Sequence, residues 1–122
     1  MKGKDVVNAL YKAMSENPDK KVLELFDIAR KMEAPRFYVT FDQARRFVSM
    51  LDRGLELPLK NENKKRMYKE LYRRLKKKRG DKKGCYTLLE EIITSSAPEF
   101  YIDADTFNQI FYKTIRNKEK KM

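Results

Sequence analysis

Histidine and tryptophan are absent from the 122 residues, which include one cysteine, four glycines and four prolines. Without histidine the protein lacks the commonest general base near neutral pH and the usual transition-metal ligand. One cysteine excludes an internal disulfide and a four-ligand zinc site. The glycines are too scattered to form a phosphate-binding loop. We therefore expect a binding protein rather than an enzyme, with no catalytic residue, metal or cofactor.

Long apolar runs are also absent. No run approaches the ~18 residues of a membrane-spanning helix, and the first five residues, MKGKD, lack the apolar stretch of a secretory signal. We expect a soluble, cytoplasmic protein with no membrane partner. Because 41% of the residues are apolar, including seven Phe and seven Tyr, the chain has enough hydrophobic side chains for a folded core.

A six-residue element occurs twice. Residues 34–39, APRFYV, recur as residues 97–102, APEFYI, at an offset of 63 and without a gap on either side. Upstream of each element an apolar stripe has the helical spacing i, i+3, i+4, i+7. The two stripes consist of Val22, Leu25, Phe26 and Ala29, and of Cys85, Leu88, Leu89 and Ile92. This pattern predicts two copies of a helix, a short loop and a second helix.

The predicted ends of the second helix in each copy also match. Thr40 and Asp103 are good N-caps at equivalent positions, and Gly54 and Asn117 are suitable terminators. A further helix precedes each copy, with apolar stripes Val7, Leu10, Tyr11, Met14 and, at an offset of 61, Tyr68, Leu71, Tyr72, Leu75.

These patterns predict an all-α fold of six helices, arranged as two tandem, pseudo-repeated three-helix units that share one core. The predicted boundaries are 1–54 for the first unit, 55–60 for an extended linker, 61–117 for the second unit and 118–122 for a basic tail. At this length we expect one compact domain overall.

The aromatic pairs of the repeated element allow two interpretations. We favour Phe37–Tyr38 and Phe100–Tyr101 as anchors that hold each loop against the core, because aromatic side chains are usually buried. The alternative is that Tyr38 and Tyr101 are exposed platforms for stacking bases.

The positive charge is concentrated. Residues 60–83 contain 13 Lys and Arg and three acids, residues 113–122 contain five and one, and the rest of the chain sums to −3. Because the predicted helix 64–79 uses one face for its apolar stripe, its cations must occupy the other faces. Concentrated like charge favours a polyanionic partner. We expect nucleic acid, DNA or RNA, bound mainly through its phosphates with low sequence specificity, with 113–121 as an auxiliary arm.

Ten residues are the predicted nucleic-acid contacts: Lys65, Arg66, Lys69, Arg73, Lys76, Lys77, Lys78 and Arg79 on the basic helix, with Arg45 and Arg46 on an earlier one. With about six phosphates neutralised, affinity would fall roughly a thousandfold between 50 and 200 mM salt. Base readout by Gln43 and the two earlier arginines is a weaker possibility.

Two alternatives remain open at this stage. One is a structural or adaptor protein, such as a phage or mobile-element assembly component, whose basic surface docks on an acidic protein. The other is a Mg²⁺-dependent nuclease that uses Asp103 and Asp105, although N-capping is the preferred role for these acids. A gel-shift assay over a salt series separates nucleic-acid binding from the adaptor role.

Overall fold

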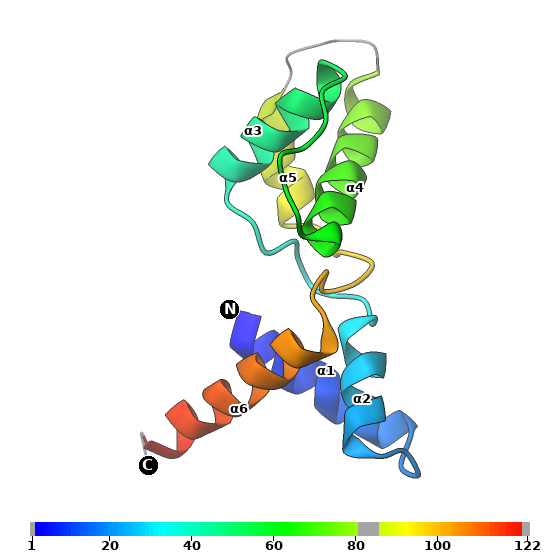
Figure 1. The fold of residues 1–122 in the computed structure, drawn as a ribbon, viewed down its shortest axis with the longest axis vertical. Coiled ribbons are helices and arrows are strands. Elements are labelled where there is room, and N and C mark those ends of the chain that lie inside the picture. Colours follow the sequence, from blue (N-terminus) through cyan, green and yellow to red (C-terminus); the bar gives the residue numbers. More distant parts are fainter. Residues whose placement is uncertain (1, 81–85, 121–122) are drawn as a thin grey trace. The chain divides into compact units, whose positions relative to one another are not determined.

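The computed structural model describes residues 2–80 and 86–120, with side chains described up to residue 117. The described residues form six α-helices and no named strand (Figure 1). The helices are α1 (Lys2–Glu16), α2 (Val22–Arg30), α3 (Phe41–Asp52), α4 (Glu62–Arg79), α5 (Leu89–Ile93) and α6 (Ala104–Lys120), with a 3₁₀ turn, η1 (Tyr86–Leu88), before α5. The predicted all-α class is confirmed.

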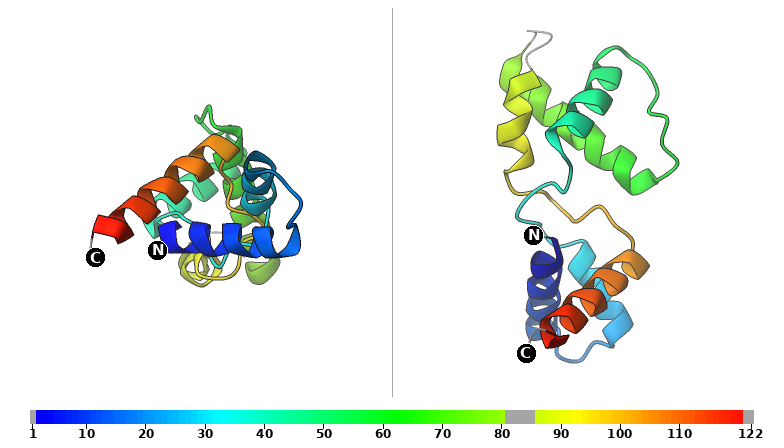
Figure 2. Two further views of the ribbon diagram at one scale, coloured as in Figure 1. Left: turned by 90° about the horizontal axis from the view of Figure 1, so that it is seen from below. Right: turned by 90° about the vertical axis from the view of Figure 1, so that its left-hand side faces the viewer.

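The chain divides into two compact units. Unit 1 (Met1–Ala34 with Ala97–Met122) contains α1, α2 and α6, and unit 2 (Pro35–Ser96) contains α3, α4 and α5 (Figures 1 and 2). Each unit therefore takes two helices from one copy of the repeat and the third helix from the other copy. The compact units do not coincide with the predicted ranges 1–54 and 61–117, and the segment 55–60 lies inside unit 2.

The connections after α2 and after α5 account for this exchange of helices. Pro35 and Pro98 disfavour the helical conformation at the alanine before each of them. Those alanines, Ala34 and Ala97, instead form an antiparallel bridge, and each N–H donates to the other's carbonyl at 2.8 Å. After this bridge each connection leads to a helix that belongs to the other compact unit.

Local structure recurs at the 63-residue offset. In unit 2 the Phe37 N–H donates to the Ile93 carbonyl at 2.9 Å, and in unit 1 the Phe100 N–H donates to the Arg30 carbonyl at 3.1 Å. These four residues occupy equivalent places in the two copies. The same backbone contact therefore closes each three-helix unit on the last turn of α2 or α5.

Both predicted N-caps are confirmed, whereas one predicted terminator is wrong. Thr40 Oγ1 accepts from the Gln43 N–H at 3.1 Å, and Asp103 Oδ1 accepts from the Thr106 N–H at 2.7 Å. Gly54 follows α3 with a φ of 75°, as a terminator should. Asn117 lies inside α6, which continues to Lys120, so residues 118–120 of the predicted tail are helical.

The N-cap of α6 leads to a prediction about the free energy of unfolding. Asp103→Ala should lower the free energy of unfolding by about 1 kcal/mol, because the Thr106 N–H loses its acceptor. Asp103→Asn should be nearly neutral, since asparagine caps equally well. Urea unfolding followed by circular dichroism measures both variants. Equal losses for the two would show that the carboxylate charge, and not the capping hydrogen bond, is what matters.

The core of unit 1 is aromatic. Phe26 of α2 packs against Phe107 and Phe111 of α6, with ring centroids 6.0 and 5.9 Å apart. From α1 the buried residues are Val6, Leu10 and Ala13.

On α1 the buried apolar stripe lies one position away from the predicted one. Leu10 is buried, but Val7 is half-buried, and Tyr11 and Met14 are 54% and 46% exposed. The parallel stripe Val6–Leu10–Ala13 has the same spacing and faces the core instead. On α2 the predicted core residue Val22 is exposed, and its counterpart Cys85 lies outside the described residues.

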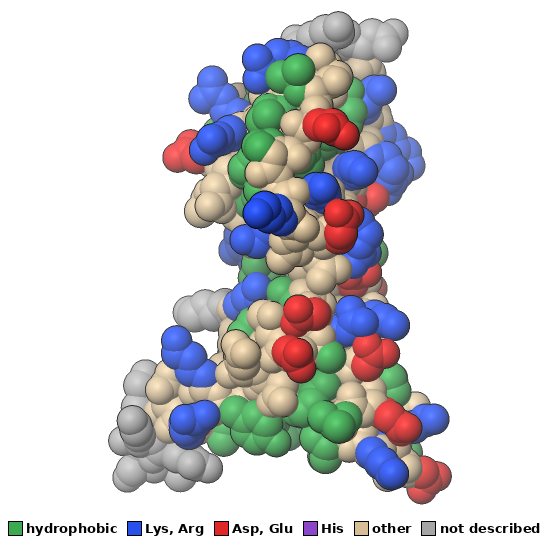
Figure 3. Space-filling model, in the orientation of Figure 1, with side chains coloured by type: hydrophobic (Ala, Val, Ile, Leu, Met, Phe, Trp, Pro, Cys, Tyr) green, Lys and Arg blue, Asp and Glu red, His purple; other side chains and the backbone are tan. Residues whose placement is uncertain are grey.

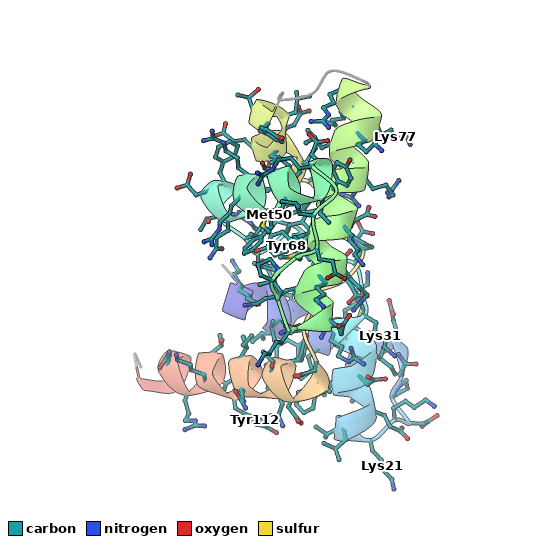
Figure 4. The ribbon with its side chains drawn as sticks, turned by 45° about the horizontal axis from the view of Figure 1, so that its top comes forward. Lys21, Lys31, Met50, Tyr68, Lys77 and Tyr112 are labelled. Carbon is teal, nitrogen blue, oxygen red and sulfur yellow. The ribbon has the colours of Figure 1, made fainter. Side chains whose placement is uncertain are left out.

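The core of unit 2 lies between α4 and the two other helices. Met67, Tyr68, Leu71 and Leu75 of α4 are buried together with Val48 of α3 and Leu89 and Ile92 of α5. The rings of Phe47 and Tyr68 have centroids 4.7 Å apart, and Figure 4 shows Tyr68 in the interior of this unit. The predicted row of apolar residues on α4 is confirmed at Tyr68, Leu71 and Leu75, whereas Tyr72 is half-buried.

The loop aromatics are mostly anchors. Phe37, Phe100 and Tyr101 are buried, and Tyr38 is half-buried. Tyr101 adopts a φ of 57°, in the left-handed region that non-glycine residues rarely occupy. Burial removes the ring of Tyr101 from stacking with a base.

Candidate nucleic-acid interface

The two units differ in charge. Unit 2 contains 17 Lys and Arg and eight Asp and Glu, a formal net charge of +9, whereas unit 1 contains 12 and ten, a net charge of +2. In the view of Figure 3, basic side chains gather along the edge of unit 2 where Figure 1 draws α4. The candidate interface is therefore sought on this unit.

Five cations form an exposed stripe along α4. They are Arg66, Lys69, Arg73, Lys76 and Lys77, and all five are exposed. Their spacing of i, i+3, i+7, i+10 and i+11 places them on one side of the helix, opposite the buried Met67, Leu71 and Leu75. We call these five residues the α4 stripe. At 1.5 Å per residue it extends over about 16 Å, and Figure 4 shows Lys77 on the outer side of the helix.

The chain's own acids neutralise part of this charge. Glu70 binds Arg73 through two hydrogen bonds of 2.7 and 2.8 Å and also binds Arg74 at 2.8 Å. The Arg73 guanidinium, followed by that of Arg74, lowers the pKa of Glu70 below its usual value, against the opposing effect of burial. The side chain of Arg73 is nevertheless 61% exposed, so one side of its guanidinium remains accessible.

Three lysines of the α4 stripe differ from Arg73 in this respect. Among the described residues, no carboxylate lies within ion-pair distance of Lys69, Lys76 or Lys77. The Lys76 ammonium lies 5.3 Å from the Tyr72 ring, a cation–π distance. These three side chains are the best-placed donors for an external anion.

Two predicted contacts, Lys65 and Lys78, lie off the stripe and are paired. Lys65 Nζ lies 3.4 Å from Glu62 Oε1, and Lys78 Nζ lies 3.0 Å from Glu91 Oε1. Pairs this exposed contribute little stability, so a phosphate could replace either carboxylate at small cost.

The prediction that Arg79 contacts nucleic acid is wrong. Its side chain is only 3% exposed, and Nη2 donates to Asp52 Oδ1 at 2.6 Å. The reason is its position, because residue 79 follows Leu71 and Leu75 at four-residue intervals and continues the buried stripe.

Asp52, which sequence reasoning missed, is the centre of this buried cluster. Besides Arg79 it accepts hydrogen bonds from Tyr72 Oη at 3.3 Å and from Tyr86 Oη at 3.0 Å. The Arg79 hydrogen bond lowers the pKa of Asp52, and the same contact raises the pKa of Arg79. A usable signal was the spacing Ala44, Val48, Asp52, which puts the carboxylate in line with two core residues.

Arg45 and Arg46 are exposed on α3, also in unit 2. The Arg46 guanidinium carbon lies 5.4 Å from the centroid of the Phe47 ring. The part of these two arginines in an interface remains a prediction.

The acids proposed for a nuclease are not gathered into a metal site. Asp103 is engaged as the N-cap of α6, and its pKa is lowered chiefly by the Thr106 backbone hydrogen bond. Throughout residues 2–80 and 86–120, no three His, Cys, Asp or Glu side chains are grouped closely enough to hold a metal ion. Within the same ranges, no helix has the length and hydrophobicity required to span a membrane.

Comparison with protein-family models, with curated proteins and with solved structures gives no match. A functional assignment must therefore be argued from the residues themselves.

Proposed function

We propose that this protein binds nucleic acid in the cytoplasm, without catalysis, through phosphate contacts made by the α4 stripe. The observation that carries the proposal is the row of five exposed cations on one face of a unit with net charge +9. Three of these cations have no carboxylate partner among the described residues. Like charges held this close repel one another, and a polyanion relieves the repulsion.

The proposed interface is one of backbone recognition. Lysine ammonium groups bind phosphate as point charges and carry no sequence information of their own. Because each neutralised phosphate releases counterions, about five contacts would give a slope of log affinity against log salt near −4.5. Affinity should then fall roughly 500-fold between 50 and 200 mM salt, with little dependence on sequence.

Fluorescence anisotropy with a labelled duplex of about 20 base pairs tests the proposal. The expected result is tight binding at about 50 mM salt, weakening steeply as salt is raised, for two unrelated sequences alike. Absence of binding at the lowest salt would overturn the proposal and favour docking on an acidic protein. Binding that does not depend on salt would also contradict it.

A further inference from the structure

Unit 1 differs from unit 2 in exposing hydrophobic side chains. Among the described residues, the large exposed hydrophobic side chains are Tyr11, Met14, Val22, Leu23, Leu55 and Tyr112, and all except Leu55 belong to unit 1. Figure 3 shows hydrophobic side chains at the surface over α6, and Figure 4 shows Tyr112 on the outer side of that helix. The two aromatic members, Tyr11 and Tyr112, are 54% and 46% exposed.

Both tyrosine rings are held by the core of unit 1. Phe111 lies edge-on to Tyr11, with centroids 6.4 Å apart, and also packs against Tyr112 at 5.3 Å. Phe26 supports the Tyr112 ring from a further side, at 6.2 Å. Because these contacts restrict the two rings, an aromatic ligand that stacks on them would cost less side-chain entropy than stacking on an unsupported ring.

A cavity adjoins Tyr11. It has a volume of about 550 Å³ and lies between α1 and α6, with Val7, Tyr11 and Ile115 among its apolar lining. Asn8 and Asn117, whose side chains are amides, also line the cavity. An amide offers both a donor and an acceptor, as the edge of a nucleobase requires. The volume is in the range of ordinary ligand sites.

Several cations lie on the two helices that form the cavity. Lys4 lines the cavity, and Lys12, Lys113 and Arg116 are exposed on the same two helices. A second copy of unit 1 would itself carry a net charge of +2, and so would not compensate these cations. An aromatic ligand that carries negative charge is favoured instead.

We infer that unit 1 binds single-stranded nucleic acid, with one unpaired base in the α1–α6 cavity against Tyr11 and a second base stacked on Tyr112. The inference rests on the proposed function and deepens it, since it adds a site for bases to a site for phosphates. Aromatic stacking with flanking cations is the usual means by which proteins hold single strands.

The test measures the affinity of the 122-residue protein for an oligothymidylate of about 12 nucleotides and for a duplex of equal length. Tyr11→Ala should weaken binding to the oligothymidylate about 5- to 100-fold, whereas duplex binding stays within about twofold. Tyr11→Phe should retain single-strand binding, because the ring and not the hydroxyl stacks. Tyr11→Leu, which preserves apolar packing on Phe111, should lose it as Tyr11→Ala does.

The matched control is Met14→Ala, since Met14 lies on the same helix, is 46% exposed and does not line the cavity. It should leave both affinities unchanged. The inference is overturned if Tyr11→Ala and Tyr11→Leu bind the oligothymidylate as the unchanged protein does, or if light scattering shows that the protein is a dimer which Tyr11→Ala dissociates. If duplex binding still depends on salt in the same experiment, the proposed function is supported even when the base-binding inference fails. The two proposals can therefore be tested separately.

Discussion

Replacing Asp52 by asparagine should lower the free energy of unfolding by about 3 kcal/mol, the largest stability effect we expect from a single polar substitution. The carboxylate side chain is 7% exposed and is paired with an Arg79 side chain that is 3% exposed. Arg79 Nε and Nη1 are buried and have no hydrogen-bond partner among the described residues, so Asp52 provides the main compensation for this charge. Asp52→Asn would leave the guanidinium buried without a counter-charge.

Urea unfolding followed by circular dichroism measures this effect. Asp27→Asn is the matched control, because Asp27 also pairs with an arginine, Arg30, but its side chain is 49% exposed. It should produce no resolvable change. Combining Asp52→Asn with Arg79→Met should recover much of the loss, since the unpaired buried charge is removed. A loss below about 0.5 kcal/mol for Asp52→Asn would contradict this account of the cluster.

The Asp52–Arg79 pair should also make the stability of the fold depend on pH. Because the pKa of Asp52 is lowered in the folded protein, its ionised form is favoured by folding. Its contribution is therefore complete above the unfolded pKa of about 3.9 and is lost as the pH falls through the folded value. Asp52→Asn should show a smaller loss of stability on acidification through this range than the unchanged protein.

Replacing the three lysines of the α4 stripe that have no carboxylate partner among the described residues should give the largest effect on binding. We expect Lys69→Gln, Lys76→Gln and Lys77→Gln together to weaken duplex binding about a hundredfold at 150 mM salt, because three counterion-releasing contacts are lost. All three side chains are exposed, so the free energy of unfolding should change by less than about 1 kcal/mol, chiefly through loss of the Lys76–Tyr72 contact. Anisotropy titration with the same labelled duplex provides the measurement.

A control with the same change in net charge separates local contacts from overall charge. Lys20, Lys21 and Lys31 are exposed in unit 1, and their replacement by glutamine also lowers the net charge from +11 to +8. This variant should lose less than about threefold in duplex affinity. Equal losses in the two variants would show that total charge governs binding and that the stripe has no special role.

Much of the local structure could be predicted from the sequence. The prolines after Ala34 and Ala97, the caps Thr40 and Asp103, and the stripe Tyr68–Leu71–Leu75 depend on chemistry within a few residues. The exchange of α3 and α6 could not be predicted in this way. It depends on the two extended connections pairing with each other, a contact between residues 63 positions apart. The spacing of apolar residues predicts a helix, but it does not predict which other helices pack against it.

The candidate site also combines features that nearby residues predict with features that depend on distant contacts. The exposure of Lys69, Lys76 and Lys77 follows from helical spacing around a reliable apolar stripe. Arg79 also has a cationic side chain, but it continues the buried stripe of α4. Its acidic partner on α3, Asp52, compensates the buried charge and could not be predicted from helical spacing. Tyr11 was expected in the core because two parallel apolar stripes exist on α1, and the packing of α2 and α6 selects between them.

The salt dependence of duplex binding tests the central claim most directly. For the unchanged protein we expect log affinity to fall with log salt at a slope near −4.5, and for the Lys69, Lys76 and Lys77 triple variant at a slope shallower by about 2.7. Identical slopes for the two proteins would contradict phosphate binding by the α4 stripe, whatever the absolute affinities.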